Sequence, residues 1–460
     1  MISLTLNEIA NVVDGIMLNA TGAELVTAPA FIDSRAIIAG GIFVALVGER
    51  ADGHAFAAEA VQAGAVAAIV SKDVGVRSVR VADPVLALQR LAAHARNSLP
   101  NLKVVGITGS QGKTTTKDLL FAILSAVSPT IAPEGSLNNE LGVPLTLLRC
   151  TESTRYCILE MGARHRGDIA KLASLAAIDV GAVLNIGSAH VGEFGSLANL
   201  ARTKGELISA LKSNGVAILG TYDSSTIELS EIASCPVTTF GETALSDIRG
   251  ESVSLVHGLP TFHLVRGEES VQVRLKYYGR HQVANALAAA AVAVELGVSV
   301  SKIADLLTEA TPLSHWRMEV TQREGDGVTV INDSYNANPE SMAAALNLLG
   351  EWARVEKRSS WAILGQMHEL GASSDEAHRL IGRLVAQSGI EHLLVVGSSA
   401  GEILNGAREM AIEDGELVLD SGAALDYLRT RAEAGALILV KASRAEGLEK
   451  LALEITGGSA

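Results

Sequence analysis

The sequence predicts an α/β fold of three domains that contain parallel β-sheets. Short runs of Val, Ile and Leu alternate with Ala-rich stretches along the chain, which is the pattern of strands that alternate with helices. Aromatic residues make up only 3% of the chain, whereas the chain has 44 Gly and Ala is abundant throughout. A chain of 460 residues also corresponds to three domains, at roughly 150 residues each.

Charge and cysteine content narrow the class of protein. The chain has 37 Lys and Arg against 51 Asp and Glu, and this net charge of −14 argues against a protein built to bind nucleic acid or an anionic membrane surface. The three cysteines, Cys150, Cys157 and Cys235, show no CxxC spacing, which favours a reduced compartment. We expect Cys150 and Cys157 to be buried hydrophobic residues rather than catalysts.

No targeting or membrane-spanning segment is expected. The N-terminal residues lack a basic region followed by an apolar core, which a secretory signal needs. The most apolar stretches, such as Ala284–Leu296, fall short of the roughly 18 to 20 residues of a membrane span. We therefore predict a cytoplasmic protein without stable membrane insertion.

The first predicted domain covers residues 1–83. It contains short apolar strands over Ile42–Val47 and Ala67–Val70, and an Ala-rich helix over Ala55–Gly64. This small α/β unit is followed by a connecting helix.

The second predicted domain covers residues 84–313. Its connecting helix begins with Asp83 as cap and Pro84 in the first turn, and it ends at the breaker cluster Asn97–Pro100. The apolar stripe expected on this helix consists of Leu86, Leu88, Leu91 and Ala95. A strand over Lys103–Thr108 follows.

The third predicted domain covers residues 314–460 and alternates helix and strand to its end. We expect it to be a separate Rossmann-like α/β domain. Its predicted strands are Val328–Ile331, Trp361–Leu364, Leu393–Val396 and Ala436–Val440.

The most informative motif is a Gly-rich loop between a strand and a helix. Glycines let consecutive backbone N–H groups converge on a phosphate, and the helix N-terminus adds positive partial charge. Lys113 adds a full charge, and Thr114 is placed to offer its hydroxyl to Mg²⁺. The strict phosphate-loop pattern is missed because Ile107 stands where its first Gly is required. An ordinary Gly-rich turn is the alternative. The loop comprises Gly109, Ser110, Gln111, Gly112, Lys113, Thr114 and Thr115.

Two further residues follow predicted strands of the same domain. Glu160 closes the strand over Tyr156–Leu159, and His190 follows a strand over Val180–Ile186. The carboxyl edge of a parallel sheet is where open α/β sheets bind ligands, so both side chains are candidates for a site. A surface glutamate and a structural histidine are the ordinary alternatives.

These motifs, together with others along nearly the whole chain, resemble the Mur ligase family. The phosphate loop matches the family pattern, with Gln111 where Asn is usual. The other matching segments, in order, are Asn138–Asn139, Gly142–Pro144, Ile158–Gly162, Asn185–Gly187 with Ala189–His190, Ala201–Glu206, Gly279–His281 with Asn285–Ala286, Arg317–Glu319, Asn332–Pro339 and Lys441–Arg444.

Details within the family resemble the member that adds D-alanyl-D-alanine to UDP-N-acetylmuramoyl-tripeptide. The segments Asp333–Pro339 and Gly365–Gly371 carry this likeness. The N-terminal segments Asp33–Arg35 and Asp52–His54 resemble the UDP-binding domain of that member and of its tripeptide-forming relative. The Asp-Asn-Pro-Arg signature of the relative is absent. The chain departs from common family residues at Gly41, Ser136 and Ala442.

The resemblance implies a role for each motif. Phosphate contact is implied for Arg317, ribose contact for Asp333, and adenine contact for Asn285. The implied ATP site comprises Gly109, Ser110, Gln111, Gly112, Lys113, Thr114, Thr115, His281, Asn285, Arg317 and Asp333. The implied substrate contacts are Ser34, Arg35, Asn138, Asn139, Tyr335, Asn336 and Asn338. The implied catalytic residues are Lys113, Lys204, His190 and Arg317.

The resemblance also implies two Mg²⁺ ions. Their ligands would be Thr114, Glu160, His190 and Lys204, with Lys204 carbamylated so that it bridges to the second metal. A solvated lysine on the helix near Leu197–Leu211 is the alternative for Lys204.

The implied function is an ATP-dependent, ADP-forming ligase of peptidoglycan synthesis. It would join D-alanyl-D-alanine to a UDP-tripeptide, whose third residue is lysine or diaminopimelate, through an acyl phosphate; we expect a monomer. Another Mur-type ligase, or a folylpolyglutamate synthase, is one alternative. A non-catalytic nucleotide-binding module is the other, and the joint presence of Glu160, His190 and Lys204 argues against it.

Overall fold

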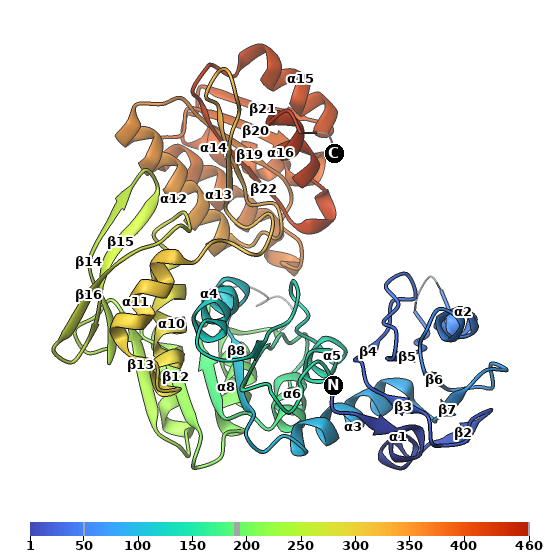
Figure 1. Cartoon of the computed structure of the whole chain (residues 1–460). Coiled ribbons are helices and arrows are strands. Elements are labelled where there is room, and N and C mark those ends of the chain that lie inside the picture. The colour runs from blue at the N-terminus through green and yellow to red at the C-terminus, as the bar shows by residue number, and fades with distance from the viewer. Residues whose placement is uncertain (49–50, 188–193, 459–460) are drawn as a thin grey trace.

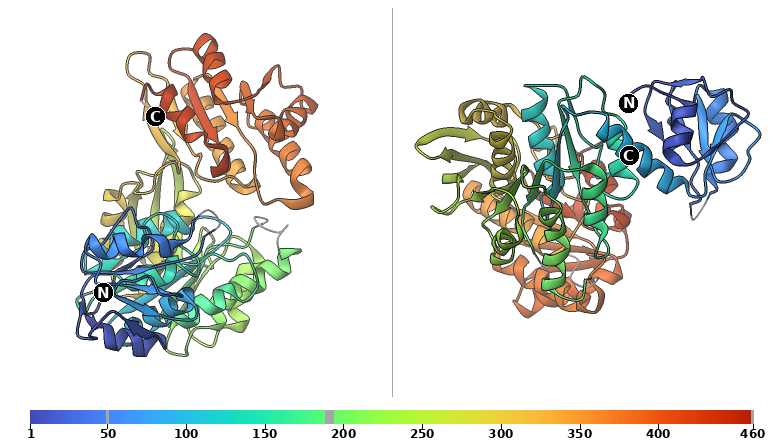
Figure 2. Two further views of the ribbon diagram at one scale, coloured as in Figure 1. Left: turned by 90° about the vertical axis from the view of Figure 1, so that its right-hand side faces the viewer. Right: turned by 90° about the horizontal axis from the view of Figure 1, so that it is seen from below.

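The computed structural model describes residues 1–48, 51–187 and 194–458. Three main sheets follow one another along the chain and have helices packed on them, so the predicted α/β class is confirmed. Figure 1 shows the C-terminal part above the central part, and Figure 2 shows the N-terminal part standing off one side. In the described residues, no helix combines the length and the apolar character that a membrane span requires.

The N-terminal part is a five-stranded sheet in the order β2-β7-β6-β5-β4, with β2 antiparallel to β7. The strand expected over Ile42–Val47 ends at Val44, because the chain then turns and the Leu46 carbonyl accepts from the Gly53 N–H. The expected Ala-rich helix is a 3₁₀ turn, η1, followed by a short α2. The elements are β1 (Leu4–Thr5), α1 (Leu6–Val13), β2 (Ile16–Leu18), β3 (Leu25–Val26), β4 (Ala30–Phe31), β5 (Ile42–Val44), η1 (Gly53–Phe56), α2 (Ala57–Gln62), β6 (Ala67–Val70) and β7 (Ser78–Arg80).

Helix α3 (Pro84–Asn97) joins this part to the central part and begins as predicted. The Asp83 carboxylate accepts hydrogen bonds from the backbone N–H groups of Val85 and Leu86, which caps the helix. The predicted stripe was wrong at Leu86, whose side chain is 43% exposed. The buried positions instead follow the helical period from one residue later, because α3 packs against α1, α5 and α6: they are Ala87, Leu88, Leu91, Ala92 and Ala95.

The central part is a nine-stranded sheet in the order β16-β15-β14-β13-β12-β11-β8-β10-β9. Its pairs are parallel from β9 to β14, and two antiparallel strands complete the sheet. The strands are β8 (Lys103–Thr108), β9 (Thr130–Ile131), β10 (Tyr156–Glu160), β11 (Val180–Val183), β12 (Val216–Gly220), β13 (Val237–Gly241), β14 (Ile248–Val256), β15 (Leu259–Arg266) and β16 (Glu269–Arg274).

Helices cover both faces of this sheet. Along β8, Val104 belongs to the core under α5, α6 and α8, while Val105 belongs to the core under α4, α10 and α11. This alternation is the period of two that a strand buried on both faces requires. The helices are α4 (Lys113–Ser125), α5 (Gly142–Leu147), α6 (Asp168–Ala176), α8 (Leu197–Ser209), α9 (Ser224–Ile227), η2 (Glu228–Ile232), α10 (Gln282–Glu295) and α11 (Val300–Glu309).

The C-terminal part is a six-stranded sheet in the order β17-β18-β22-β19-β20-β21, in which only β17 is antiparallel. The edge strand β21 was not predicted, because its sequence DGELV is polar and half exposed. The elements are β17 (Glu319–Gln322), β18 (Thr329–Asn332), α12 (Pro339–Glu356), β19 (Ser360–Leu364), η3 (Gly371–Ser373), α13 (Ser374–Gln387), β20 (His392–Val396), η4 (Ser398–Ala400), α14 (Gly401–Glu409), β21 (Asp414–Val418), α15 (Ser421–Arg431), β22 (Leu437–Lys441), η5 (Arg444–Glu446) and α16 (Glu449–Ile455).

Candidate active site

A cavity of about 540 Å³ lies where the carboxyl edge of the central sheet meets the C-terminal part. The chain reaches β9 and β10 on one side of β8 and β11 on the other, so this edge is a topological switch point. Figure 1 shows α4, which follows β8, at the boundary between the two parts. The lining residues that the sequence singled out are Ser110, Gln111, Gly112, Lys113, Thr114, Thr115, Asn138, Glu160, His281, Asn285, Arg317, Asp333, Tyr335, Asn336 and Asn338.

The phosphate loop has the backbone arrangement of an anion cradle. Gly112 caps α4 with φ of 81°, and within the described ranges no side chain accepts from the first N–H groups of the helix. The loop is held from outside by Asn185, whose carbonyl accepts from Ser110 N–H at 3.1 Å and whose side chain accepts from Gln111 N–H at 3.0 Å. The Lys113 ammonium folds back onto the carbonyl of Gly109 at 2.7 Å. A phosphate group placed here would meet open N–H donors and one ammonium.

Replacing Gly112 with alanine should weaken nucleotide binding about tenfold or more. A Cβ atom would come within 2.2 Å of Asn285 Oδ1, and a φ of 81° is strained for any residue with a Cβ atom. Strain of this kind costs about 1–3 kcal/mol. Titration with a fluorescent ADP analogue measures the effect. Gly297→Ala is the matched control, because Gly297 also has a positive φ but open space around its Cβ position; equal losses in both variants would contradict the prediction.

Glu160 and Thr114 provide oxygen atoms beside the loop. Glu160 is 1% exposed at the end of β10, where its carboxylate accepts from Thr114 Oγ1 and from Asn138 Nδ2, both at 2.9 Å. Hydroxyl and carboxylate oxygens in contact suit a hard cation such as Mg²⁺, so these two residues fit the predicted metal role. The described residues contain no cluster of three His, Cys, Asp or Glu side chains that could hold a metal. His190 lies outside the described residues.

Lys204 is buried on α8 and is not the solvated surface lysine of the alternative interpretation. Burial lowers its pKa well below the ordinary value, and the nearby charge of Lys113 lowers it further. The pKa of Lys113 is also lowered, chiefly by burial; Arg317 adds to this effect and Glu160 opposes it. The ammonium form of Lys204 is therefore less favoured than that of a solvated lysine.

The start of α10 forms the wall opposite the loop. Asn285 donates to Gln282 Oε1 at 2.8 Å and accepts from Thr116 Oγ1 at 3.4 Å, which ties α10 to α4. The side-chain amide of Gln282 lies 3.0 Å from His281 Nε2. Burial lowers the pKa of His281 to about 4, so its imidazole is neutral at physiological pH. Neutral imidazole and amide groups suit an uncharged heterocycle.

Arg317 reaches the cavity from the C-terminal part on a strained turn. Its neighbours Trp316 and Met318 both have positive φ, at 57° and 53°. The turn is fixed because Met318 N–H donates to Asp333 Oδ1 at 3.0 Å, and the buried Lys441 holds Asp333 Oδ2 at 2.5 Å. Among the described residues, nothing accepts a hydrogen bond from the buried Arg317 Nε. A buried guanidinium donor that faces a cavity in this state suits an anionic ligand.

The predicted substrate residues lie in three places. Tyr335 lies under the Arg317 guanidinium at 4.0 Å, and its hydroxyl is 2.5 Å from Ser136 Oγ. The Asn139 side chain instead caps α5, accepting from Leu141 and Gly142. Ser34 and Arg35 lie in the N-terminal part and do not line the cavity. The exposed Arg35 bonds Asp33 there.

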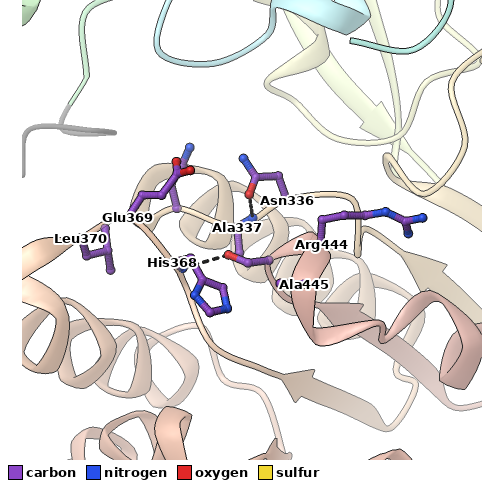
Figure 3. Close-up of a pocket in the computed structure, with 9 residues that line it drawn as sticks. Asn336, Ala337, His368, Glu369, Leu370, Arg444 and Ala445 are labelled. Atoms are coloured by element: carbon purple, nitrogen blue, oxygen red, sulfur yellow. Dashed lines mark hydrogen bonds between the residues drawn. The ribbon is translucent and has the colours of Figure 1, made fainter. Parts of the chain in front are cut away.

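A second pocket of about 210 Å³ adjoins the first and shares Asn336 and Asn338 with it. It lies at the carboxyl ends of β18, β19 and β22, and its loops are joined where His368 N–H donates to Ser443 Oγ at 2.9 Å. Figure 3 shows the carboxyl group of Glu369 and the amide of Asn336 pointing toward the space between the C-terminal and central parts. Arg444 stacks on Trp316 at 4.0 Å. The pocket thus carries charges of both signs.

Several cavity residues were missed as site residues from the sequence. Asn185 and Lys441 lie within the segments that resemble the family, and Ser136 is one of the positions where the chain departs from the family pattern. The sequence could therefore have pointed to these three residues. Gln282 and Glu340 carried none, because one lies in an Ala-rich helix and the other follows a proline at a helix start. Their positions in the cavity depend on how two distant parts of the chain meet.

The fold and the cavity define a phosphate-loop α/β protein with a nucleotide-type site. Three family models match in succession: "Mur ligase family, catalytic domain" over residues 30–106, "Mur ligase middle domain" over 107–293, and "Mur ligase, glutamate ligase domain" over 316–444. The chain belongs to the Mur ligase family.

Relatives in the family are similar over nearly their whole length. UDP-N-acetylmuramoyl-tripeptide–D-alanyl-D-alanine ligase of Mycobacterium tuberculosis is 42% identical over 98% of this chain and 97% of that protein. The enzyme of the same name from Escherichia coli is 36% identical over 98% of both. MurF from Acinetobacter baumannii has a TM-score of 0.89 at 34% identity, covering 99% of both chains. MurF ligase from Thermotoga maritima in complex with ADP has a TM-score of 0.79 at 29% identity, covering 94% of this chain and 97% of that one.

Proposed function

We propose that the protein joins D-alanyl-D-alanine to UDP-N-acetylmuramoyl-tripeptide with hydrolysis of ATP to ADP and phosphate, in the synthesis of peptidoglycan. The observation that carries this proposal is the convergence of the phosphate loop, Glu160 and Arg317 on one cavity. Relatives with this activity in their names match the chain over its full length. The reaction would take place in the cytoplasm, with the protein as a monomer.

The three predicted domains divide the work in this proposal. Residues 1–83 would hold the UDP group, with Ser34 and Arg35 as contacts, and residues 84–313 would hold ATP. Residues 314–460 would bring Arg317 and the dipeptide. Because the three groups lie on separate sheets, closure between parts is needed to bring the reacting atoms together.

In the reaction, the carboxylate of the stem peptide must approach the negatively charged phosphates of ATP. A carboxylate oxygen of the stem peptide bonds to the γ-phosphorus as the bond to the β,γ-bridging oxygen breaks, which gives an acyl phosphate and ADP. The dipeptide amine then bonds to the acyl carbon and loses a proton, and the C–O bond to phosphate breaks. Lys113 and Arg317 would neutralise charge on the phosphates, and the open N–H groups of α4 would orient them.

Mg²⁺ would supply further charge neutralisation at the phosphate oxygens. Thr114 and Glu160 would hold one ion, and His190 and a carbamylated Lys204 the other. The contact between Thr114 and Glu160, and the buried position of Lys204, support these roles.

The second pocket is the site that we propose for the dipeptide. A zwitterionic dipeptide needs a cation for its carboxylate and polar acceptors for its ammonium, and Arg444 and Glu369, which both line this pocket, would supply them. Because Asn336 and Asn338 line both pockets, a dipeptide bound here would adjoin the larger cavity, which the phosphate loop also lines.

Arg444→Leu should raise the KM for D-alanyl-D-alanine about tenfold or more, because one charge-assisted hydrogen bond to the carboxylate is lost. Affinity for ADP should stay within about twofold. Steady-state kinetics at varied dipeptide measure the first effect, and nucleotide titration the second. Arg429→Leu is the matched control, since Arg429 is exposed on α15. An unchanged dipeptide KM in the Arg444 variant would exclude this pocket.

The function itself is tested by phosphate release with UDP-tripeptide, in the presence and absence of D-alanyl-D-alanine. Dipeptide-dependent release together with formation of the pentapeptide product is the expected result. Release that depends on a different amine would indicate another Mur-type ligase. Nucleotide binding without turnover would indicate a binding module.

A further inference from the structure

Lys117 is a buried lysine that neither pocket uses. It lies on α4, one turn beyond Lys113, and only 4% of the residue is exposed. Its ammonium is 2.7 Å from Asp118 Oδ1 and donates to the main-chain carbonyls of Pro133 at 3.1 Å and Gly135 at 3.4 Å. The ammonium thus has three close partners, and two of them are carbonyls of one segment of main chain.

That segment, residues 133–137, is called here the Ser136 loop. It follows β9, and no described strand or helix includes it. A loop outside secondary structure depends on side chains to fix its main chain. From its position on α4, Lys117 donates hydrogen bonds to two main-chain carbonyls of this loop.

The Ser136 loop meets the C-terminal part at the cavity. Ser136 Oγ is 2.5 Å from the hydroxyl of Tyr335, and the Tyr335 ring carries the Arg317 guanidinium at 4.0 Å. Directly after the loop, Asn138 bonds the carboxylate of Glu160. A continuous chain of contacts thus runs from Lys117 through the Ser136 loop and Tyr335 to Arg317.

We propose that Lys117 is a positioning residue that holds the Ser136 loop in the conformation that Tyr335 engages, and thereby sets the place of Arg317. The effect on turnover rests on the proposed function, whereas the hold of Lys117 on the Ser136 loop does not. Without the two carbonyl contacts the main chain of the loop is no longer bonded to α4, and the Ser136–Tyr335 contact loses its fixed partner.

The competing explanation is that Lys117 serves only as the partner of the buried Asp118 carboxylate. Two variants separate the explanations. Asp118→Asn removes the ion pair but leaves the carbonyl contacts of Lys117, whereas Lys117→Met removes the contacts. Because Lys117→Met leaves a buried carboxylate without its partner, Lys117→Met/Asp118→Leu provides a folded form that lacks both charges.

The experiment combines hydrogen exchange with a double-mutant cycle. Amides of residues 131–141 should exchange at least about tenfold faster in the Lys117 variants, and should be unchanged in Asp118→Asn. The ligase kcat/KM should fall about tenfold in Lys117→Met and in Tyr335→Phe, and the combined variant should be little worse than either, because both changes release the same contact. ADP affinity should change by less than about twofold, since the N–H groups of the phosphate loop remain in place.

Unchanged exchange at residues 131–141 in both Lys117 variants would overturn the proposal, as would additive effects in the cycle. Equal damage from Asp118→Asn would assign Lys117 to the ion pair alone and overturn it as well. A wild-type protein without dipeptide-dependent turnover would contradict the proposed function. The exchange result would still show whether Lys117 holds the Ser136 loop.

Discussion

Replacing Lys113 with alanine should lower ATP turnover by at least about 100-fold while leaving the fold intact. The ammonium is the one full positive charge of the phosphate loop, and loss of a single preorganised group at a developing charge costs about 10²–10³ in rate. Among the described residues, the Lys113 ammonium donates one hydrogen bond, to the Gly109 carbonyl, and this is the described bond that the substitution breaks. The midpoint of thermal unfolding should therefore change little.

Phosphate release under saturating substrates measures this effect, with circular dichroism as the check on folding. Lys171→Ala is the matched control, because Lys171 is an exposed lysine on α6 of the same part. Activity of Lys113→Ala within a few-fold of the wild type would show that this loop is not the ATP site.

Local sequence signals predicted the elements that surround the phosphate loop. The strand Lys103–Thr108 has the predicted bounds, and α3 begins at its predicted proline after Asp83. Both depend on neighbours within a few residues: an apolar run that ends in glycine, and an Asp-Pro start signal. The strand predicted over Tyr156–Leu159 is also present, and it extends one residue further, to Glu160.

Long-range packing decided what the sequence did not reveal. The antiparallel strands β15 and β16 continue a parallel sheet that ends at β14, a strand whose sequence mixes charged residues such as Arg249 and Glu251 with apolar ones. Leu86 and Ala87 differ by one position on α3, and only the neighbouring helices determine which of them is buried.

The candidate site shows the same division. Phosphate-loop residues were found from one continuous motif, whereas Gln282 is in place only because α10 packs on α4. The burial of Lys204 could not be read from its helix, since a lysine at that spacing is equally compatible with solvent. Ser34 and Arg35 stay predictions, because the structure leaves them in a part that does not line the cavity.

Replacing Lys204 with alanine should remove most of the activity, and short carboxylates such as acetate should restore part of it. The two Mg²⁺ ions that we propose beside ATP would need anionic oxygen ligands, and Glu160 alone could not fill both positions. A free ammonium would instead repel a nearby cation, at a cost of about 4 kcal/mol for unit charges about 4 Å apart at an effective dielectric constant of about 20. In the reaction with CO₂ the neutral amine nitrogen bonds to the carbon and releases a proton to solvent, which gives a carbamate with two oxygens and a negative charge.

That reaction requires a neutral amine, which the site favours. Burial and the neighbouring Lys113 lower the pKa of Lys204 well below its ordinary value, so the neutral form is populated at a lower pH than for a solvated lysine. Protonation at falling pH removes the amine that reacts with CO₂. Wild-type activity in CO₂-free buffer should accordingly fall as pH is lowered, and bicarbonate should restore it.

The experiment compares turnover of Lys204→Ala with and without added acetate, in CO₂-free buffer and in bicarbonate. Lys212→Ala is the matched control, an exposed lysine that follows the same helix. A carbamate on Lys204 predicts that acetate rescues the alanine variant alone, because the small carboxylate enters the space left by the side chain. Mass spectrometry of the intact protein at neutral pH should also show an added CO₂ that the variant lacks. Full activity of Lys204→Ala in CO₂-free buffer would mean that the buried lysine takes no part in metal binding.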